Sequence, residues 1–207
     1  MTIPLPLPAN GIDVALPGAS LTLLPDWLER ERAARLFDEL RDTLPWSVHR
    51  LRMFGRTVDS PRLSAWIGDP GATYRYSGTD FAPHPWTEAL SALRERLERE
   101  LEVPFNSVLA NLYRTGRDAM GWHSDDEPEL GPQPAIASVS LGGVRRFALK
   151  HRQDATLRRT FELPHGSLLV MAGDTQHLYR HALPRTAREV APRINLTFRW
   201  IEPARRR

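Results

Sequence analysis

The stretch "RINLTFR", residues 193–199, alternates polar and apolar side chains along its whole length. An extended strand points successive side chains to opposite faces. One face would therefore carry three apolar groups, and the other would carry the polar set Arg193, Asn195, Thr197 and Arg199. The polar face meets either water, as one face of many antiparallel sheets does, or an anion held inside the protein.

The residues around this stretch predict a mostly antiparallel β protein. Two earlier segments, residues 26–42 and 84–102, repeat apolar residues every three or four positions, which predicts amphipathic helices. Beyond Val103, short β-rich runs are separated by glycine and proline, as strands are by turns. The expected architecture is one β domain, a sandwich, barrel or jelly roll, braced by the helices. The expected strands are "SVLANLYR", "AIASVSLGG", "RRFALKH", "RRTFELPHG", "SLLVMAG" and "RINLTFRW".

The composition limits the class of protein. The chain has 207 residues, 41% hydrophobic and 26% charged, which suits one soluble globular core. No apolar run approaches the roughly 20 residues of a membrane span, and the opening "MTIPLPLPAN" lacks the features of a signal peptide. The absence of cysteine excludes disulfides, thiolate metal sites and cysteine nucleophiles. We expect a cytoplasmic protein without a membrane partner.

Arginine predominates over lysine among the basic residues. Of the 28 basic residues only Lys150 is a lysine, and the formal net charge is +3. Arginine suits phosphates and carboxylates, so the bias indicates a polyanionic partner, although genomic base composition produces the same bias.

The segment "GWHSDDEPE" has the spacing of a metal site. His123 and Asp125 are two positions apart, so on an extended segment both side chains point the same way. Two histidines and one carboxylate form the facial site of non-haem Fe(II) oxygenases, which leaves three positions open. His177 and His181 in "TQHLYRHALP" are both candidates for the third ligand. A solvated acidic turn can have the same sequence as the His123–Asp125 pair, so that pair alone does not establish a metal site.

Taken together, these motifs resemble the AlkB family of Fe(II)- and 2-oxoglutarate-dependent dioxygenases, which repair alkylated nucleic acid. The resemblance covers roughly residues 50 to 200. No single piece is specific for the family. The combination is specific, and it consists of HxD, a later histidine and RxNxTxR. The matching pieces are "MFG", "TYRYSG", "NLYRTGRDAMGWHSDDE", "AIASVSLGG", "HGSLLVM", "YRHALP" and "APRINLTFR".

The resemblance implies an α+β, mainly β fold whose core is a double-stranded β-helix, a cupin-like jelly roll braced by N-terminal helices. Residues 1–207 would form a single domain. Its expected parts are an N-terminal extension and helix at 1–45, a nucleotide-recognition hairpin region at 46–82 and a jelly-roll catalytic core at 103–201.

The resemblance also assigns a cofactor site. It implies Fe(2+) held by His123, Asp125 and His181, with His177 as a supporting donor or as the alternative third ligand. The cosubstrate 2-oxoglutarate would bind Arg193 through its distal carboxylate and Arg199 through the end nearer the iron. The residues expected to support it are Asn111, Tyr113 and Asn195, although an Asn and a Tyr on a half-wet strand are common without a ligand.

Substrate recognition is expected in the hairpin region, because a methyl group in stacked DNA reaches the metal only if its base is flipped out. By resemblance, Phe54 at the hairpin tip fills the gap, or it is an ordinary hairpin core residue. Tyr74 and Tyr76, joined by Trp66, would hold the flipped base, although tyrosines at this spacing are common in plain sheets.

Acidic and basic residues near the motifs are further substrate candidates. Asp126 and Glu127 would hold the base, or they keep a surface turn soluble. Arg62, Arg185 and Arg188 are candidate phosphate contacts. The loop "PRTAREVAP" is less basic than in relatives that repair duplex DNA, so the preference for single or double strands stays open.

The expected function is oxidative demethylation. By resemblance, a monomer removes N-alkyl lesions of the 1-methyladenine and 3-methylcytosine type from DNA, with RNA left open, and releases succinate, CO₂ and formaldehyde. One alternative is the same iron chemistry on RNA, protein or a small molecule. The other is a non-oxidising nucleic-acid-binding module or a metal hydrolase, which a requirement for 2-oxoglutarate would exclude.

Overall fold

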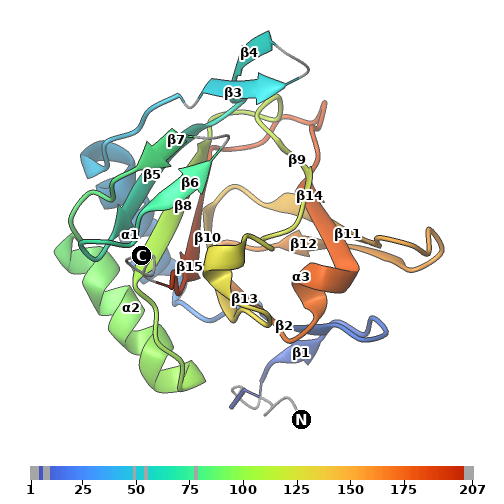
Figure 1. Cartoon of the computed structure of the whole chain (residues 1–207). Helices are drawn as coiled ribbons and strands as arrows, with labels where there is room; N and C mark the ends of the chain where they lie inside the picture. The colour runs from blue at the N-terminus through green and yellow to red at the C-terminus, as the bar shows by residue number, and fades with distance from the viewer. Residues whose placement is uncertain (1–4, 7–9, 49, 54–55, 77–78, 203–207) are drawn as a thin grey trace, which may run out of the picture.

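The computed structural model describes residues 5–6, 10–48, 50–53, 56–76 and 79–202. Two antiparallel sheets of seven and four strands face each other and form a jelly roll (Figure 1). The expected mainly β fold is therefore confirmed. Among the described residues, no helix is both long and apolar enough to cross a membrane.

The arginine-bearing strand β15 (Arg193–Arg199) lies inside the larger sheet. It pairs with β10 (Ile136–Gly142) on one side and β8 (Ser107–Tyr113) on the other. Every residue of β15 is buried. Its apolar residues belong to the main core cluster, whereas its polar residues line a pocket between the sheets. Neither face of the strand meets bulk water, because helices cover one face and the smaller sheet covers the other.

The larger sheet also takes strands from earlier in the chain than the expected core. Its order is β1-β2-β13-β10-β15-β8-β5. Besides β10, β15 and β8, the sheet contains β1 (Ile12–Asp13), β2 (Ser20–Leu24), β5 (Leu63–Gly68) and β13 (Ser167–Ala172). Strand β2 pairs with β13, so residues before position 46 build part of the sheet. Four of the five residues of β2 are buried, which removes the alternation that marks a strand in a sequence.

The smaller sheet carries the histidines of the metal motif. Its order is β12-β11-β14-β9, and its strands are β12 (Arg158–Leu163), β11 (Arg145–His151), β14 (Tyr179–Leu183) and β9 (Met120–His123). Two hairpins stand apart from both sheets. They are formed by β3 (Arg50–Met53) with β4 (Arg56–Asp59), and by β6 (Tyr74–Tyr76) with β7 (Thr79–Phe81). The expected hairpin around residue 54 is thus confirmed by the pairing of its strands.

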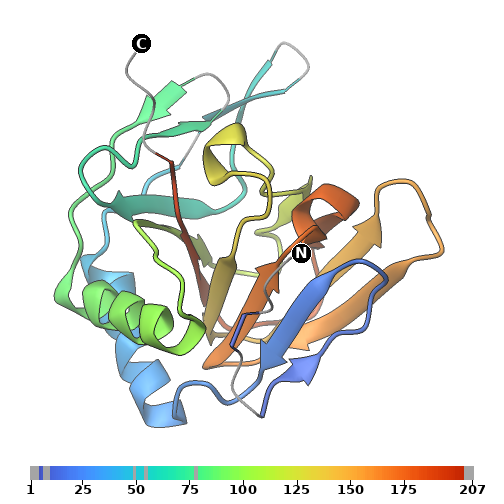
Figure 2. The same ribbon diagram turned by 60° about the horizontal axis from the view of Figure 1, so that its bottom comes forward.

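Two long helices pack on the outer face of the larger sheet, on the side away from the smaller sheet (Figure 2). They are α1 (Arg30–Thr43) and α2 (Glu88–Leu101), as the leucine spacing predicts. Thr87 caps α2, since its hydroxyl oxygen accepts from the Leu90 N–H at 3.3 Å. Residues 25–28 before α1 form a turn and a bend, where the Leu28 N–H donates to the Gly166 carbonyl at 2.9 Å, and the helix begins later than expected. Two short helices, η1 (Pro128–Leu130) and α3 (Thr175–Leu178), were not predicted.

Candidate metal and cosubstrate site

The metal motif gathers on the paired strands β9 and β14. His123 and His181 are direct partners across the two strands, and their rings lie 4.2 Å apart between centroids. Asp125 follows β9, with its Oδ1 3.8 Å from His123 Nε2. One donor atom from each of the three residues lies within 4.8 Å of the others. The strand pairing therefore brings together residues that are 58 positions apart in the sequence, from His123 to His181.

Hydrogen bonds fix the loop that carries Asp125. The Asp125 backbone N–H donates to Gln176 Oε1 at 3.0 Å, and the Ser124 hydroxyl donates to the Tyr179 carbonyl at 2.8 Å. Both acceptors come from α3 and the start of β14. The carboxylate is consequently tied to the same segment that carries His181.

The two histidines differ in their surroundings. His123 Nδ1 lies 2.9 Å from the Gly121 carbonyl, which can only accept, and the other ring nitrogen, Nε2, lies on the side of Asp125. Burial, together with the neighbouring His123 and Arg199, lowers the pKa of His181 to about 3, although Asp125 opposes the shift. His181 is neutral at physiological pH and has no proton to lose before it binds a metal.

Asp125 forms a buried ion pair with Arg199. Arg199 Nη2 donates to Asp125 Oδ2 at 2.8 Å. Burial opposes the charged carboxylate, but Arg199 and the two histidines outweigh that effect and lower the pKa of Asp125. The carboxylate is ionised, with Oδ2 engaged by Arg199 and Oδ1 directed toward His123.

His177 does not belong to this cluster. Its ring nitrogen Nε2 contacts the Pro132 carbonyl, on an exposed part of α3. Of the two histidines that the sequence left open, only His181 lies with His123 and Asp125.

Arg193 forms the other end of the site. Its side chain is 1% exposed, and its Nη2 donates to Ser140 Oγ at 2.9 Å and to Asn195 Oδ1 at 2.6 Å. Its Nε and Nη1 atoms have no hydrogen-bond partner among the described residues. Burial lowers the pKa of Arg193 to about 10, with Tyr113 opposing the shift and Arg145 adding to it. A buried guanidinium without a carboxylate is costly, so its two unpartnered nitrogens are suited to an incoming anion.

The remaining expected cosubstrate residues surround Arg193. The Tyr113 ring lies 5.4 Å from the Arg193 guanidinium carbon, and Asn195 Nδ2 donates to Thr197 Oγ1 at 2.9 Å. Asn111 Oδ1 accepts from Arg62 Nε at 2.7 Å and from Ser64 Oγ at 3.0 Å. Asn111 is therefore held in one orientation by two donors.

A single pocket joins the two ends. It encloses about 450 Å³, including the part that opens to solvent, which is ample for a small diacid. All residues that the sequence assigned to metal and cosubstrate line it, namely His123, Asp125, His181, Asn111, Tyr113, Arg193, Asn195 and Arg199. Two imidazoles and a carboxylate suit iron(II), and the unpartnered nitrogens of Arg193 suit a carboxylate. The donor set thus fits both an iron ion and a keto diacid.

Two expected substrate contacts lie elsewhere and need correction. Arg62 is 5% exposed and bound to Asn111, so it supports the pocket and does not reach a phosphate. Trp66 is buried against Ala72 and Leu130, and its Nε1 donates to the Ala72 carbonyl at 2.9 Å. A base cannot stack on a ring enclosed in this way. Arginine is mostly exposed in folded proteins, so the burial of Arg62 was not expected. The burial of Trp66 depends on Leu130, which only the tertiary fold places beside it.

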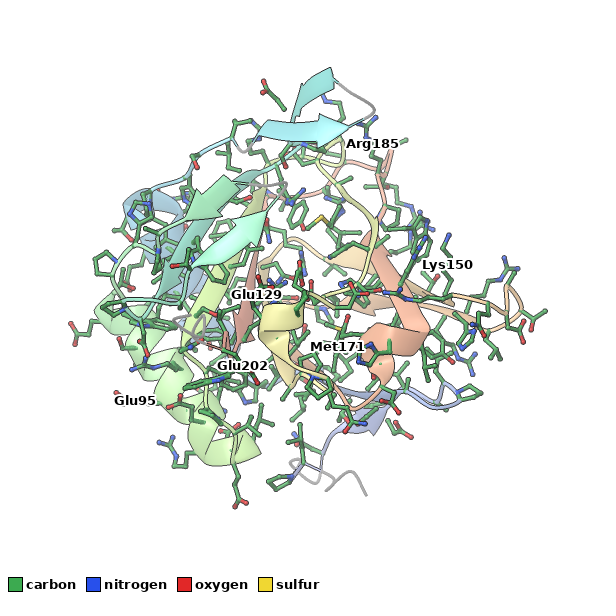
Figure 3. All side chains as sticks on the ribbon, in the orientation of Figure 1. Glu95, Glu129, Lys150, Met171, Arg185 and Glu202 are labelled. Carbon is green, nitrogen blue, oxygen red and sulfur yellow. The ribbon has the colours of Figure 1, made fainter. Side chains whose placement is uncertain are left out.

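The other substrate candidates are only partly defined. Phe54 lies outside the described residues, and only the backbone of Tyr74 and Tyr76 is described, in strand β6. Asp126 is exposed and forms an ion pair with Arg152, while Glu127 is half-buried. Arg185 and Arg188 are exposed, and Figure 3 labels Arg185 on the segment that follows β14.

Several residues of the site were not anticipated. Ser140 binds Arg193, Ser138 Oγ donates to Asn195 Oδ1 at 3.3 Å, and Gln176 holds Asp125. The two serines could have been found, because "ASVSL" alternates polar and apolar residues as "RINLTFR" does. Gln176 gives no such signal, since only the tertiary fold places it beside Asp125.

A jelly roll with two histidines and one aspartate in a buried pocket is the arrangement of non-haem iron oxygenases. A family model described as the 2OG-Fe(II) oxygenase superfamily matches residues 20–199. The alkB homolog 3 dioxygenase of Bos taurus is 37% identical over 190 residues, which cover 87% of this chain and 66% of that protein. The DNA oxidative demethylase ALKBH2 of Mus musculus is 39% identical over 187 residues, which cover 86% of this chain and 78% of that protein.

The chain therefore belongs to the AlkB family of 2OG-Fe(II) oxygenases. It is a dioxygenase that uses Fe(2+) and 2-oxoglutarate. A solved structure titled "The structure of OsALKBH1" superimposes with a TM-score of 0.57 at 18% identity, over 92% of this chain and 99% of that one. This last likeness supports the fold alone.

Proposed function

We propose that the protein is an oxidative demethylase that removes alkyl groups from base nitrogens in DNA. The observation that carries the proposal is the single pocket with a buried His123–Asp125–His181 cluster at one end and the Arg193 guanidinium at the other. The relatives named DNA oxidative demethylase supply the substrate class.

In this proposal each residue of the pocket has one role. His123, Asp125 and His181 would hold the iron, and Arg199 keeps Asp125 ionised through its contact with Oδ2. Arg193 binds the distal carboxylate of 2-oxoglutarate, because its buried Nε and Nη1 have no hydrogen-bond partner among the described residues. With these groups and O₂ bound, the centre supplies the oxidation of an N-methyl group, and succinate, CO₂ and formaldehyde are released.

The pocket walls direct that chemistry. Apolar side chains from both sheets, including Leu109, Met120, Phe147 and Leu183, line the space beside the cluster. They limit the access of water to the metal end and leave room for an apolar methyl group. A methyl group on a base inside a stacked duplex could not enter, so the base must be flipped out or lie in a single strand.

The substrate contacts are proposed from the hairpins and the exposed arginines. We infer that Phe54 fills the gap left by the flipped base and that Tyr74 and Tyr76 contact the base. The acidic candidates for the base are Asp126, which is exposed and paired with Arg152, and Glu127, which is half-buried two residues beyond Asp125. Arg185 and Arg188 would contact phosphates.

The test uses oligonucleotides that carry one 1-methyladenine or 3-methylcytosine. Purified protein is incubated with Fe(II), ascorbate and 2-oxoglutarate, and single-stranded DNA, duplex DNA and RNA are compared by mass spectrometry. We expect each repaired DNA base to lose the mass of one CH₂ group, with matching release of formaldehyde and succinate. Unchanged DNA, combined with normal 2-oxoglutarate turnover on another class of substrate, would overturn the proposed substrate. Turnover without 2-oxoglutarate would indicate a hydrolase.

A further inference from the structure

A further buried arginine, Arg145, does not line the pocket. Arg145 begins β11 and is 3% exposed. Burial lowers its pKa, and the nearby Tyr113 and Asp118 oppose that shift. Asp118 is hydrogen-bonded by both Nε and Nη2 of Arg114. The guanidinium of Arg145 instead donates its hydrogen bonds to backbone carbonyls. Burial of a charge in this way costs free energy, so we expect Arg145 to have a role that offsets the cost.

The carbonyls that Arg145 binds come from two separate segments. Its Nη1 donates to the Thr115 carbonyl at 3.2 Å, and its Nη2 donates to the Asp118 carbonyl at 2.9 Å and the Pro184 carbonyl at 2.8 Å. Thr115 and Asp118 lie in the turn that leads into β9, and Pro184 directly follows β14. One guanidinium thus joins the start of the His123 strand to the end of the His181 strand.

Backbone pairing between these strands is irregular at that same end. His181 pairs with His123 in β9, but the register shifts before Leu183 meets Met120. A bulge of this kind interrupts the ladder of hydrogen bonds. The three bonds from Arg145 lie just past this shift of register, and they join the two strands there.

Arg145 also contacts the cosubstrate end of the pocket through Tyr113. The Tyr113 ring lies 5.8 Å from the Arg145 guanidinium carbon and 5.4 Å from that of Arg193. Both cations are buried, so the ring takes part in two cation–π contacts. The position of Tyr113 in the pocket wall therefore depends on both arginines.

We propose that Arg145 is a positioning residue that holds the ends of β9 and β14 and the ring of Tyr113 in the arrangement that binds 2-oxoglutarate. The inference rests on the proposed role of Arg193 and is independent of the nucleic-acid substrate. Loss of Arg145 would loosen the Tyr113 wall and the Arg193 end, while the alternating residues of β15 stay in the larger sheet.

The experiment measures 2-oxoglutarate binding to the Mn(II)-loaded full chain by isothermal titration calorimetry. Arg145→Met keeps the length of the side chain but removes every donor, and Arg145→Lys keeps the charge without the planar fork. We expect the Kd for 2-oxoglutarate to rise about tenfold or more in Arg145→Met and less in Arg145→Lys. In turnover assays the KM for 2-oxoglutarate should rise in both variants, whereas the KM for the oligonucleotide should not.

Arg96→Met is a matched control. Arg96 also bonds a carbonyl, that of Trp27 at 2.9 Å, and lies 4.2 Å from the centre of the Trp27 ring. It differs in that it belongs to α2 and pairs with Glu100 at 2.7 Å. Its loss should lower the melting temperature without changing the Kd for 2-oxoglutarate.

A purely structural role would show a lowered melting temperature with an unchanged Kd in the Arg145 variants, and that result overturns the inference. If Arg145→Met does not fold, the Kd of Arg145→Lys decides. A failure to demethylate DNA would leave the binding result intact, so failure of the inference and failure of the proposed function are distinguishable.

Discussion

Arg199 Nη2 lies 2.8 Å from Asp125 Oδ2, and both side chains are buried at the metal end of the pocket. The pair holds a negative charge in place where a cation is to bind. Removal of one partner from such a pair leaves an uncompensated buried charge. The same contact compensates the buried charge of Asp125 in the protein without metal, and it leaves Oδ1 directed toward His123.

We predict that Arg199→Met lowers the free energy of unfolding of the metal-free protein by about 3–5 kcal/mol. Mn(II) should raise the melting temperature of this variant more than that of the wild type, because the ion then compensates Asp125. Urea unfolding and thermal scans with and without Mn(II) measure both effects. Equal shifts by Mn(II) in the two proteins would show that Arg199 and the metal do not share the carboxylate.

The choice of third ligand gives a direct comparison of two histidines. His181→Ala should abolish Mn(II) binding at micromolar concentration and all turnover, since the cluster loses one of its three donors. His177→Ala, four positions earlier, should leave both unchanged because its ring contacts the Pro132 carbonyl instead. Mn(II) binding followed by electron paramagnetic resonance distinguishes them, and loss of binding in His177→Ala would contradict the site as described.

The sequence was sufficient to predict the parts of the fold whose pattern is local. The alternation in "RINLTFR" predicted β15 and placed Arg193 and Arg199 on one face, and the leucine spacing predicted α1 and α2. Strand β2 gave no such signal, because a strand buried on both faces loses its alternation.

Residues whose role depends on distant partners were not predictable. Arg62 was expected at the surface, yet its burial depends on Asn111, 49 positions further along the chain. Gln176 reaches Asp125 only because β14 pairs with β9. Motif spacing fixed the candidate ligands, but the fold alone separated His181 from His177.

We expect Arg193 to increase the affinity for 2-oxoglutarate without stabilising the folded protein. Replacing the buried Arg193 with methionine, which is similar in length, removes an arginine for which no ion pair is found among the described residues. We expect the metal-free protein to keep its stability or gain about 1–4 kcal/mol, while the affinity for 2-oxoglutarate falls at least about a hundredfold. Urea unfolding and calorimetric titration test the two effects separately. A destabilised variant that still binds 2-oxoglutarate would contradict the role given to Arg193.

Low pH should reduce the contribution that Asp118, in the turn leading into β9, makes to the free energy of unfolding. Burial alone would raise the pKa of Asp118, but hydrogen bonds from the Arg114 side chain and backbone lower it below the ordinary value of 3.8. A lowered pKa means that the unfolded chain binds more protons, so this contribution is complete above 3.8 and is lost as the pH falls through the folded-state value. Since Arg114 is half-exposed, the contribution should be about 1 kcal/mol or less.

Asp118→Asn isolates this contribution. The difference in unfolding free energy between wild type and variant should be largest near about pH 7 and should shrink toward about pH 3. Urea titrations across that range measure it. A difference that grows as the pH falls would show that the sign is wrong.

Two arginines distinguish pocket support from phosphate contact. Arg62 donates to Asn111 in the pocket wall, whereas Arg185 is exposed on the segment that follows β14 (Figure 3). Arg62→Met should raise the KM for 2-oxoglutarate severalfold and leave the salt dependence of oligonucleotide binding unchanged. Arg185→Ala should do the reverse and reduce the slope of log K against log salt by about 1, as expected for one lost phosphate contact. Fluorescence anisotropy over a range of salt concentrations measures the slope. A reduced slope in Arg62→Met would indicate that Arg62 contacts a phosphate after all.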